Sequence, residues 1–111
     1  MNHQPSIFHQ LMDVIQDRKA HPPERSYTTS LFQGGVERIG EKIIEEAAEL
    51  VEAAHEQGAE AHQHVIHEAA DLIYHLWVML GHRDVKLSEV ETELARRFGV
   101  SGLDEKAARG E

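Results

Sequence analysis

Residues 36–57 carry the sequence VERIGEKIIEEAAELVEAAHEQ, in which apolar residues recur at intervals of three and four. This spacing predicts a long α-helix, and Gly58 follows as a residue typical of the position just after a helix. The three prolines of the chain all precede residue 24, so no proline interrupts this helix or any later one. The stretch therefore indicates an all-α fold.

Three more helices are expected around this one. Ser6 is placed to cap a first helix, which must end before His21 because a proline follows that residue. Residues 88–91, SEVE, have the form of a capping box that opens a last helix reaching Phe98. With a third helix between these, the predicted helices are residues 7–20, 36–57, 59–82 and 88–98.

Residues 24–35, ERSYTTSLFQGG, are predicted to form a loop with room for one helical turn. No alternation of β-branched residues predicts a strand. We therefore expect a single all-α domain over residues 1–98, followed by a polar tail over residues 99–111.

The composition excludes several classes of protein. The chain has 111 residues, with 20 Asp and Glu against 11 Lys and Arg, and this charge of −9 argues against binding to a nucleic-acid backbone. It has no cysteine, which excludes disulfides and thiolate metal sites. No run approaches the roughly 20 apolar residues of a membrane span, and the N-terminus lacks a signal-peptide pattern. We expect a cytoplasmic protein that binds neither nucleic acid nor membrane.

Carboxylates on the helix at 36–57 border its apolar face. At 100° per residue, Glu49 lies about 60° from Glu46, and Lys42 lies about 40° to the same side. Ile39 and Ala53 lie within about 20° of Glu46. Glu46 and Glu49 are therefore predicted at the edge of the core, with Lys42 between them.

The helix at 59–82 repeats this arrangement, with Asp71 about 60° from Glu68. A carboxylate at the edge of a core must be paired, protonated or bound to metal. Two acidic pairs on packed helices can converge on one point, and ligand sets made only of oxygen suit Mg²⁺, Mn²⁺ or Ca²⁺. Ordinary ion pairs with Lys42 and Arg38 are the alternative, and spacing alone does not separate the two.

Nine histidines are scattered along the chain. His67, Asp71 and His75 have a helical spacing that suits a transition metal, and Glu52 with His55 forms one Glu-x-x-His pair. A di-iron bundle needs that pair on two helices, so solvated or core-edge histidines are the favoured interpretation. Two aromatic residues are expected in the core or at an interface, namely Tyr74 and Trp77.

The ordered motifs resemble a known family. Glu45-Glu46, Glu49, Glu68 and Asp71 follow the pattern of the all-α nucleoside triphosphate pyrophosphohydrolases, the MazG-like fold. The flanking residues are similar to the phosphoribosyl-ATP pyrophosphohydrolases of histidine biosynthesis, and they are Ser26-Tyr27-Thr28, Gly35, Ile39, Lys42 and residues 68–76, EAADLIYHL. The similarity extends from Glu24 to Phe98. Ile44 and Glu41 depart from the usual pattern, and neither is an expected ligand.

The resemblance implies a helical hairpin that completes four-helix bundles in a homodimer, with a dimer of dimers as a further option. It implies hydrolysis of 1-(5-phosphoribosyl)-ATP to 1-(5-phosphoribosyl)-AMP and pyrophosphate, the second step of histidine biosynthesis. The implied cofactor is Mg²⁺, or alternatively Mn²⁺. The implied metal ligands are Glu46, Glu49, Glu68 and Asp71. Glu45 is assigned to the attacking water and Lys42 to a phosphate or to holding the glutamates apart. Substrate contacts are assigned to Arg38, Ser26, Tyr27 and Thr28.

Two other functions stay open on the sequence. A house-cleaning pyrophosphatase for non-canonical or deoxynucleotides would carry the same acidic site. A non-catalytic helical dimerisation module would carry the same acids as a solvated surface. The Ser26-Tyr27-Thr28 run and residues 69–76, AADLIYHL, favour the enzyme of histidine biosynthesis.

Overall fold

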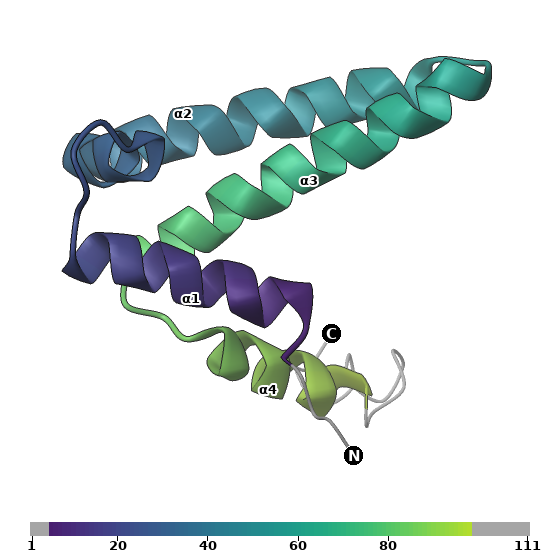
Figure 1. The fold of residues 1–111 in the computed structure, drawn as a ribbon. Coiled ribbons are helices and arrows are strands. Elements are labelled where there is room, and N and C mark those ends of the chain that lie inside the picture. The colour runs from purple at the N-terminus through teal and green to yellow at the C-terminus, as the bar shows by residue number, and fades with distance from the viewer. Residues whose placement is uncertain (1–4, 99–111) are drawn as a thin grey trace.

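A computed structural model of the chain describes residues 5–98, and this part is built from helices without any strand. The four helices are α1 (Ile7–Ala20), α2 (Tyr27–His55), α3 (Ala59–His82) and α4 (Leu87–Phe98). The two long helices, α2 and α3, form a hairpin (Figure 1). The expected all-α fold is confirmed, and the tail predicted over residues 99–111 lies outside the described residues.

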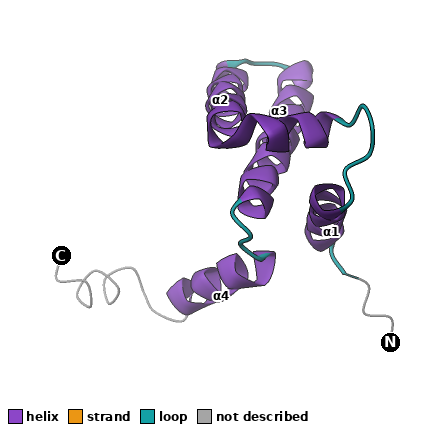
Figure 2. Cartoon of the chain, turned by 90° about the vertical axis from the view of Figure 1, so that its left-hand side faces the viewer, coloured by secondary structure: helices purple, strands orange, loops and turns teal. Residues whose placement is uncertain are grey.

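The short helices lie at the open end of the hairpin. α1 packs against α3 and α2 near that end, opposite the tight turn that joins the two long helices (Figure 1). α4 continues beyond the end of α3 (Figure 2). The imidazole of His9 on α1 lies 2.9 Å from the carboxylate of Glu91 on α4, which links the two short helices. None of the described helices combines the length and the hydropathy that crossing a bilayer requires.

The first helix is capped as predicted. The Ser6 hydroxyl accepts a hydrogen bond from the backbone N–H of His9 at 3.3 Å, and α1 ends at Ala20 before the two prolines. The last helix lies where the sequence predicts it, but the predicted capping box is wrong. α4 begins at Leu87, and the Glu89 carboxylate accepts from the Lys86 N–H at 2.9 Å. Glu89 therefore takes the role that the predicted box gives to Glu91, two residues later in the chain, and Ser88 lies inside the first turn.

The loop predicted over residues 24–35 is confirmed only at residues 24–26 and is wrong from Tyr27 onward. Residues 27–34 are helical, and the Ser26 hydroxyl caps this segment by accepting from the Thr29 N–H at 3.2 Å. Leu31 anchors the segment because its side chain is completely buried. A kink at Gly35, with φ 69° and ψ −161°, separates this segment from the rest of α2. Only glycine adopts these angles readily, so Gly35 is what joins the two helical segments.

The turn between the long helices also differs from the prediction. α2 ends at His55 and not at Gln57, with Glu56 as its C-cap. Gly58, with φ 103°, directly precedes α3. The core lies where α1, α2 and α3 meet, and its fully buried residues are Ile15, Leu31, Ile39 and Val78. Tyr74 and Trp77 pack against this core, which confirms their predicted place.

Candidate active site

The hairpin brings acidic side chains from both long helices to one place. Glu46 on α2 and Glu68 on α3 are each only 6% exposed. Oxygen atoms of Glu46, Glu49 and Glu68 all lie within 4.8 Å of one another. A second group joins Glu68 and Asp71 with the imidazole of His67 within the same distance. Because Glu68 belongs to both groups, the structure gathers all four predicted metal ligands into one carboxylate cluster.

Two oxygens of this cluster show that it suits a cation. Glu46 Oε2 and Glu68 Oε2 are buried and have no hydrogen-bond partner. A buried carboxylate oxygen without a partner destabilises the folded protein, because it has lost its hydrogen bonds to water and gained none in the protein. Oxygen donors from four carboxylates are the ligands that Mg²⁺ and Mn²⁺ prefer. The residues present therefore fit a divalent cation of this class.

The pKa of Glu46 reflects the negative charge of the cluster. Burial raises the pKa of its carboxyl group to about 7, with further increases from the negative charges of Glu49 and Asp71. The ammonium of Lys42 opposes this rise and only partly offsets it. The raised pKa shows that Glu46 lies among negative charges that Lys42 alone does not balance.

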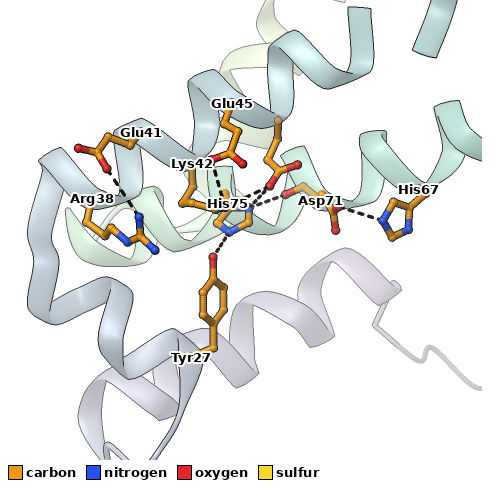
Figure 3. Close-up of polar contacts among 9 residues, drawn as sticks. Tyr27, Arg38, Glu41, Lys42, Glu45, His67, Asp71 and His75 are labelled. Atoms are coloured by element: carbon orange, nitrogen blue, oxygen red, sulfur yellow. Dashed lines mark hydrogen bonds and ion pairs between the residues drawn. The ribbon is translucent and has the colours of Figure 1, made fainter. Parts of the chain in front are cut away.

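Lys42 and Arg38 pair with glutamates, as the alternative to a metal site predicts. Lys42 Nζ lies 3.2 Å from a Glu45 oxygen and 3.8 Å from Glu46 Oε1, and the hydrogen bond to Glu45 raises the pKa of Lys42. Arg38 lies 3.6 Å from Glu41 (Figure 3). Glu45 is half exposed and lies in neither group of the cluster. One shared lysine therefore does not neutralise four carboxylates.

Two histidines contact the cluster from α3. His64 Nε2 lies 3.3 Å from Glu68 Oε1, and His67 Nε2 lies 3.2 Å from Asp71 Oδ2. Each histidine precedes its carboxylate by four residues, a spacing that was readable in the sequence. His75 belongs to neither of the two groups whose ligand atoms lie within 4.8 Å of one another. The predicted metal set of His67, Asp71 and His75 therefore does not form.

The hydroxyl run at the start of α2 has partners within the protein. Ser26 caps the helix, and the buried Thr28 hydroxyl bonds to the hydroxyl of Tyr74. The Tyr27 hydroxyl lies 2.8 Å from His75 Nε2 (Figure 3). Sequence reasoning missed this last contact, since its partners are 48 residues apart. The substrate contacts assigned to these three residues stay a prediction.

Comparison with known proteins places the chain in a family. Residues 8–98 match the family model described as phosphoribosyl-ATP pyrophosphohydrolase. The chain is 56% identical over 99 residues to a phosphoribosyl-ATP pyrophosphatase of Rhodopirellula baltica, covering 89% of this chain and 82% of that protein. It is 44% identical to the enzyme of that name from Geobacter sulfurreducens over the full length of both chains. The protein of that name from Paracoccus denitrificans is 48% identical, over 95% of this chain and 94% of that protein. This chain therefore belongs to the phosphoribosyl-ATP pyrophosphohydrolase family of phosphoanhydride hydrolases.

Proposed function

We propose that the protein hydrolyses 1-(5-phosphoribosyl)-ATP to 1-(5-phosphoribosyl)-AMP and pyrophosphate in histidine biosynthesis. The scissile bond is the anhydride between the α- and β-phosphates. The observation that carries the proposal is the carboxylate cluster, in which two buried oxygens lack partners. Its residues are the acidic positions on which the sequence resembles the family, and the relatives named above carry the name of this activity.

Mg²⁺ is the proposed cofactor, with Mn²⁺ as the alternative. Glu46, Glu49, Glu68 and Asp71 would hold it, because they supply the oxygen donors that such an ion needs. A bound cation would supply positive charge to phosphate oxygens and so let an acidic protein accept a highly negative substrate.

Three residues near the cluster would act on the substrate or on water. Lys42 carries a protonated amine beside Glu46 and would donate to a phosphate oxygen. Arg38, half exposed near the same stretch of α2, would bind a second phosphate oxygen through its guanidinium. Glu45 has an accessible carboxylate that would orient the attacking water and accept its proton.

A substrate panel tests this proposal against the house-cleaning alternative. Pyrophosphate release is measured with phosphoribosyl-ATP, ATP, dCTP and dUTP at equal concentration in the presence of Mg²⁺. We expect phosphoribosyl-ATP to have the highest kcat/KM. A higher value for a deoxynucleotide would support the house-cleaning function, and no release from any of the four would support a non-catalytic module.

We also propose that the protein is a homodimer. Ile44 and Val51 on α2 are 73% and 58% exposed, and they lie seven residues apart and so on one side of the helix. Ile66 on α3 is half exposed as well. A second copy would remove these side chains from water, which favours association. Sedimentation analysis should give a dimer that Ile44→Asp dissociates, while a monomeric wild type would contradict the proposal. The dimer of dimers and the cytoplasmic location stay predictions.

A further inference from the structure

Tyr27 and His75 join two segments of the protein beside the carboxylate cluster. Tyr27 is the first residue of α2 and lies before the kink at Gly35, whereas His75 is on α3 and is 5% exposed. Their side chains point toward each other, with 2.8 Å between the hydroxyl and Nε2 (Figure 3). This contact ties the segment before the kink to the helix that carries Glu68 and Asp71.

The hydrogen bonds of His75 fix the direction of this link. Nδ1 lies 2.9 Å from the backbone carbonyl oxygen of Asp71, which can only accept, so Nδ1 carries the hydrogen. In the neutral ring Nε2 is then an acceptor, and the Tyr27 hydroxyl donates to it. Burial raises the pKa of the Tyr27 hydroxyl, so it keeps its proton at neutral pH. Both nitrogens are therefore engaged, and the ring cannot turn without losing a hydrogen bond.

The same ring faces a proposed metal ligand. His75 Nδ1 lies 4.0 Å from Glu46 Oε1, and Lys42 Nζ lies 3.8 Å from that oxygen. The other oxygen, Oε2, has no hydrogen-bond partner. One side of the Glu46 carboxylate thus faces two nitrogens. The approach of His75 at 4.0 Å is a packing contact and not a hydrogen bond, because its Nδ1 hydrogen is donated to Asp71. The buried ring fills the space beside Oε1 and so limits how the carboxylate can turn.

We propose that Tyr27 and His75 are positioning residues, in which the Tyr27 hydroxyl holds the His75 ring, and the ring, packed beside Oε1, keeps the Glu46 carboxylate turned toward Glu49 and Glu68. This inference rests on the proposed function, since it assigns a role relative to the metal ligands. It also changes the role of Tyr27, which acts through His75 and not by contact with the substrate.

Tyr27→Phe tests the proposal because it removes only the hydroxyl. Tyr27 is 47% exposed, so this change leaves the core intact. Binding of Mn²⁺ alone to the substrate-free protein is measured by titration calorimetry, and kcat and KM for phosphoribosyl-ATP are measured separately. We expect Mn²⁺ to bind about tenfold more weakly, the lower end of the effect of removing an outer partner of a metal ligand. KM at saturating metal should stay within about twofold of the wild type, since a partner of a ligand gives the substrate no contact of its own.

Tyr74→Phe is the matched control. Its ring stacks on Tyr27 with centroids 6.3 Å apart, but its hydroxyl bonds to Thr28 and not to His75. It should leave Mn²⁺ binding unchanged. His75→Leu should weaken Mn²⁺ binding at least as much as Tyr27→Phe, and adding Tyr27→Phe to it should cause no further loss. His75→Gln, which can still accept from Tyr27, should recover part of the affinity.

The outcomes separate the two proposals. Unchanged Mn²⁺ binding in Tyr27→Phe, together with a raised KM, would overturn the positioning role and make Tyr27 a substrate contact, while the proposed function would stand. A wild-type protein that binds no Mn²⁺ would overturn both. Equal loss in Tyr74→Phe would show a general effect of the aromatic stack and would also overturn the inference.

Discussion

Glu46 on α2 and Glu68 on α3 approach each other across the helical hairpin, with an oxygen of each within 4.8 Å of an oxygen of the other. Both residues are buried, and each has one oxygen without a hydrogen-bond partner. Two like charges in such a place oppose folding unless a proton or a cation compensates them. The stability of the protein should therefore respond to charge removal, to pH and to divalent ions at this one pair.

Glu46→Gln should make the metal-free protein more stable. The substitution removes a buried charge and supplies an amide that can donate to a neighbouring carboxylate. A pKa near 7 in place of 4.5 corresponds to a gain on the order of 1–3 kcal/mol at pH 8. Urea denaturation in EDTA measures it. Glu52→Gln, an exposed change on the same helix, should stay within about 0.5 kcal/mol of the wild type. A less stable Glu46→Gln protein would contradict this account.

The pH dependence has a definite sign. The pKa of Glu46 is raised in the folded protein to about 7, so the folded state holds this proton more tightly than the unfolded chain does. Its contribution to the metal-free stability is present below pH 4.5 and is lost as pH rises to 7. A cation must displace the proton, so Mg²⁺ affinity should rise with pH up to about 7 and level off above it. Calorimetry in buffers of different ionisation enthalpy measures proton release, and an affinity that falls between pH 6 and 7 would contradict the assignment.

Gly35→Ala should destabilise the protein by about 1–3 kcal/mol, because φ 69° with ψ −161° is a conformation that alanine adopts only under strain. Gly40→Ala is the matched control on the same helix. A Cβ at Gly40 meets nothing within 4 Å, and its helical backbone suits alanine, so this change should stabilise by about 0.5–1 kcal/mol. Chemical denaturation compares the two variants. A Gly35→Ala protein as stable as the wild type, or more stable, would show that the kink does not need glycine.

Glu49→Ala and Asp71→Ala should each lower kcat by at least about 100-fold, since the loss of a metal ligand removes several kcal/mol of transition-state stabilisation. Circular dichroism should show an unchanged helix content, because both side chains lie at the edge of the core and not inside it. Glu52→Ala is the control and should keep the wild-type rate. A normal rate in either ligand variant would remove that residue from the site.

Local periodicity predicted the burial pattern of the long helices well. Ile39 and Ala53, placed near Glu46 by their helical angle, are almost fully buried, as is Glu46 itself. Glu41 and Glu52, which lie about 140° and 120° from Glu46 around the helix, are exposed. This succeeds because the rotation per residue is a property of the helix alone and does not depend on its neighbours.

Features that depend on tertiary contacts were not predictable in this way. The segment 27–34 looks like a loop because hydroxyl residues favour turns, yet the burial of Leu31 against other helices makes it helical. The contact between Tyr27 and His75 exists only because the kink at Gly35 turns this segment toward α3. No pattern within a short window of sequence contains that information.

The central claim is most directly tested by the release of pyrophosphate from phosphoribosyl-ATP by the purified protein, with Mg²⁺ and with EDTA. The carboxylate cluster predicts multiple turnovers with Mg²⁺, with phosphoribosyl-AMP formed in equal amount, and a loss of activity in EDTA that added Mg²⁺ restores. Equal rates of release with Mg²⁺ and with EDTA, or no release under either condition, would contradict the claim.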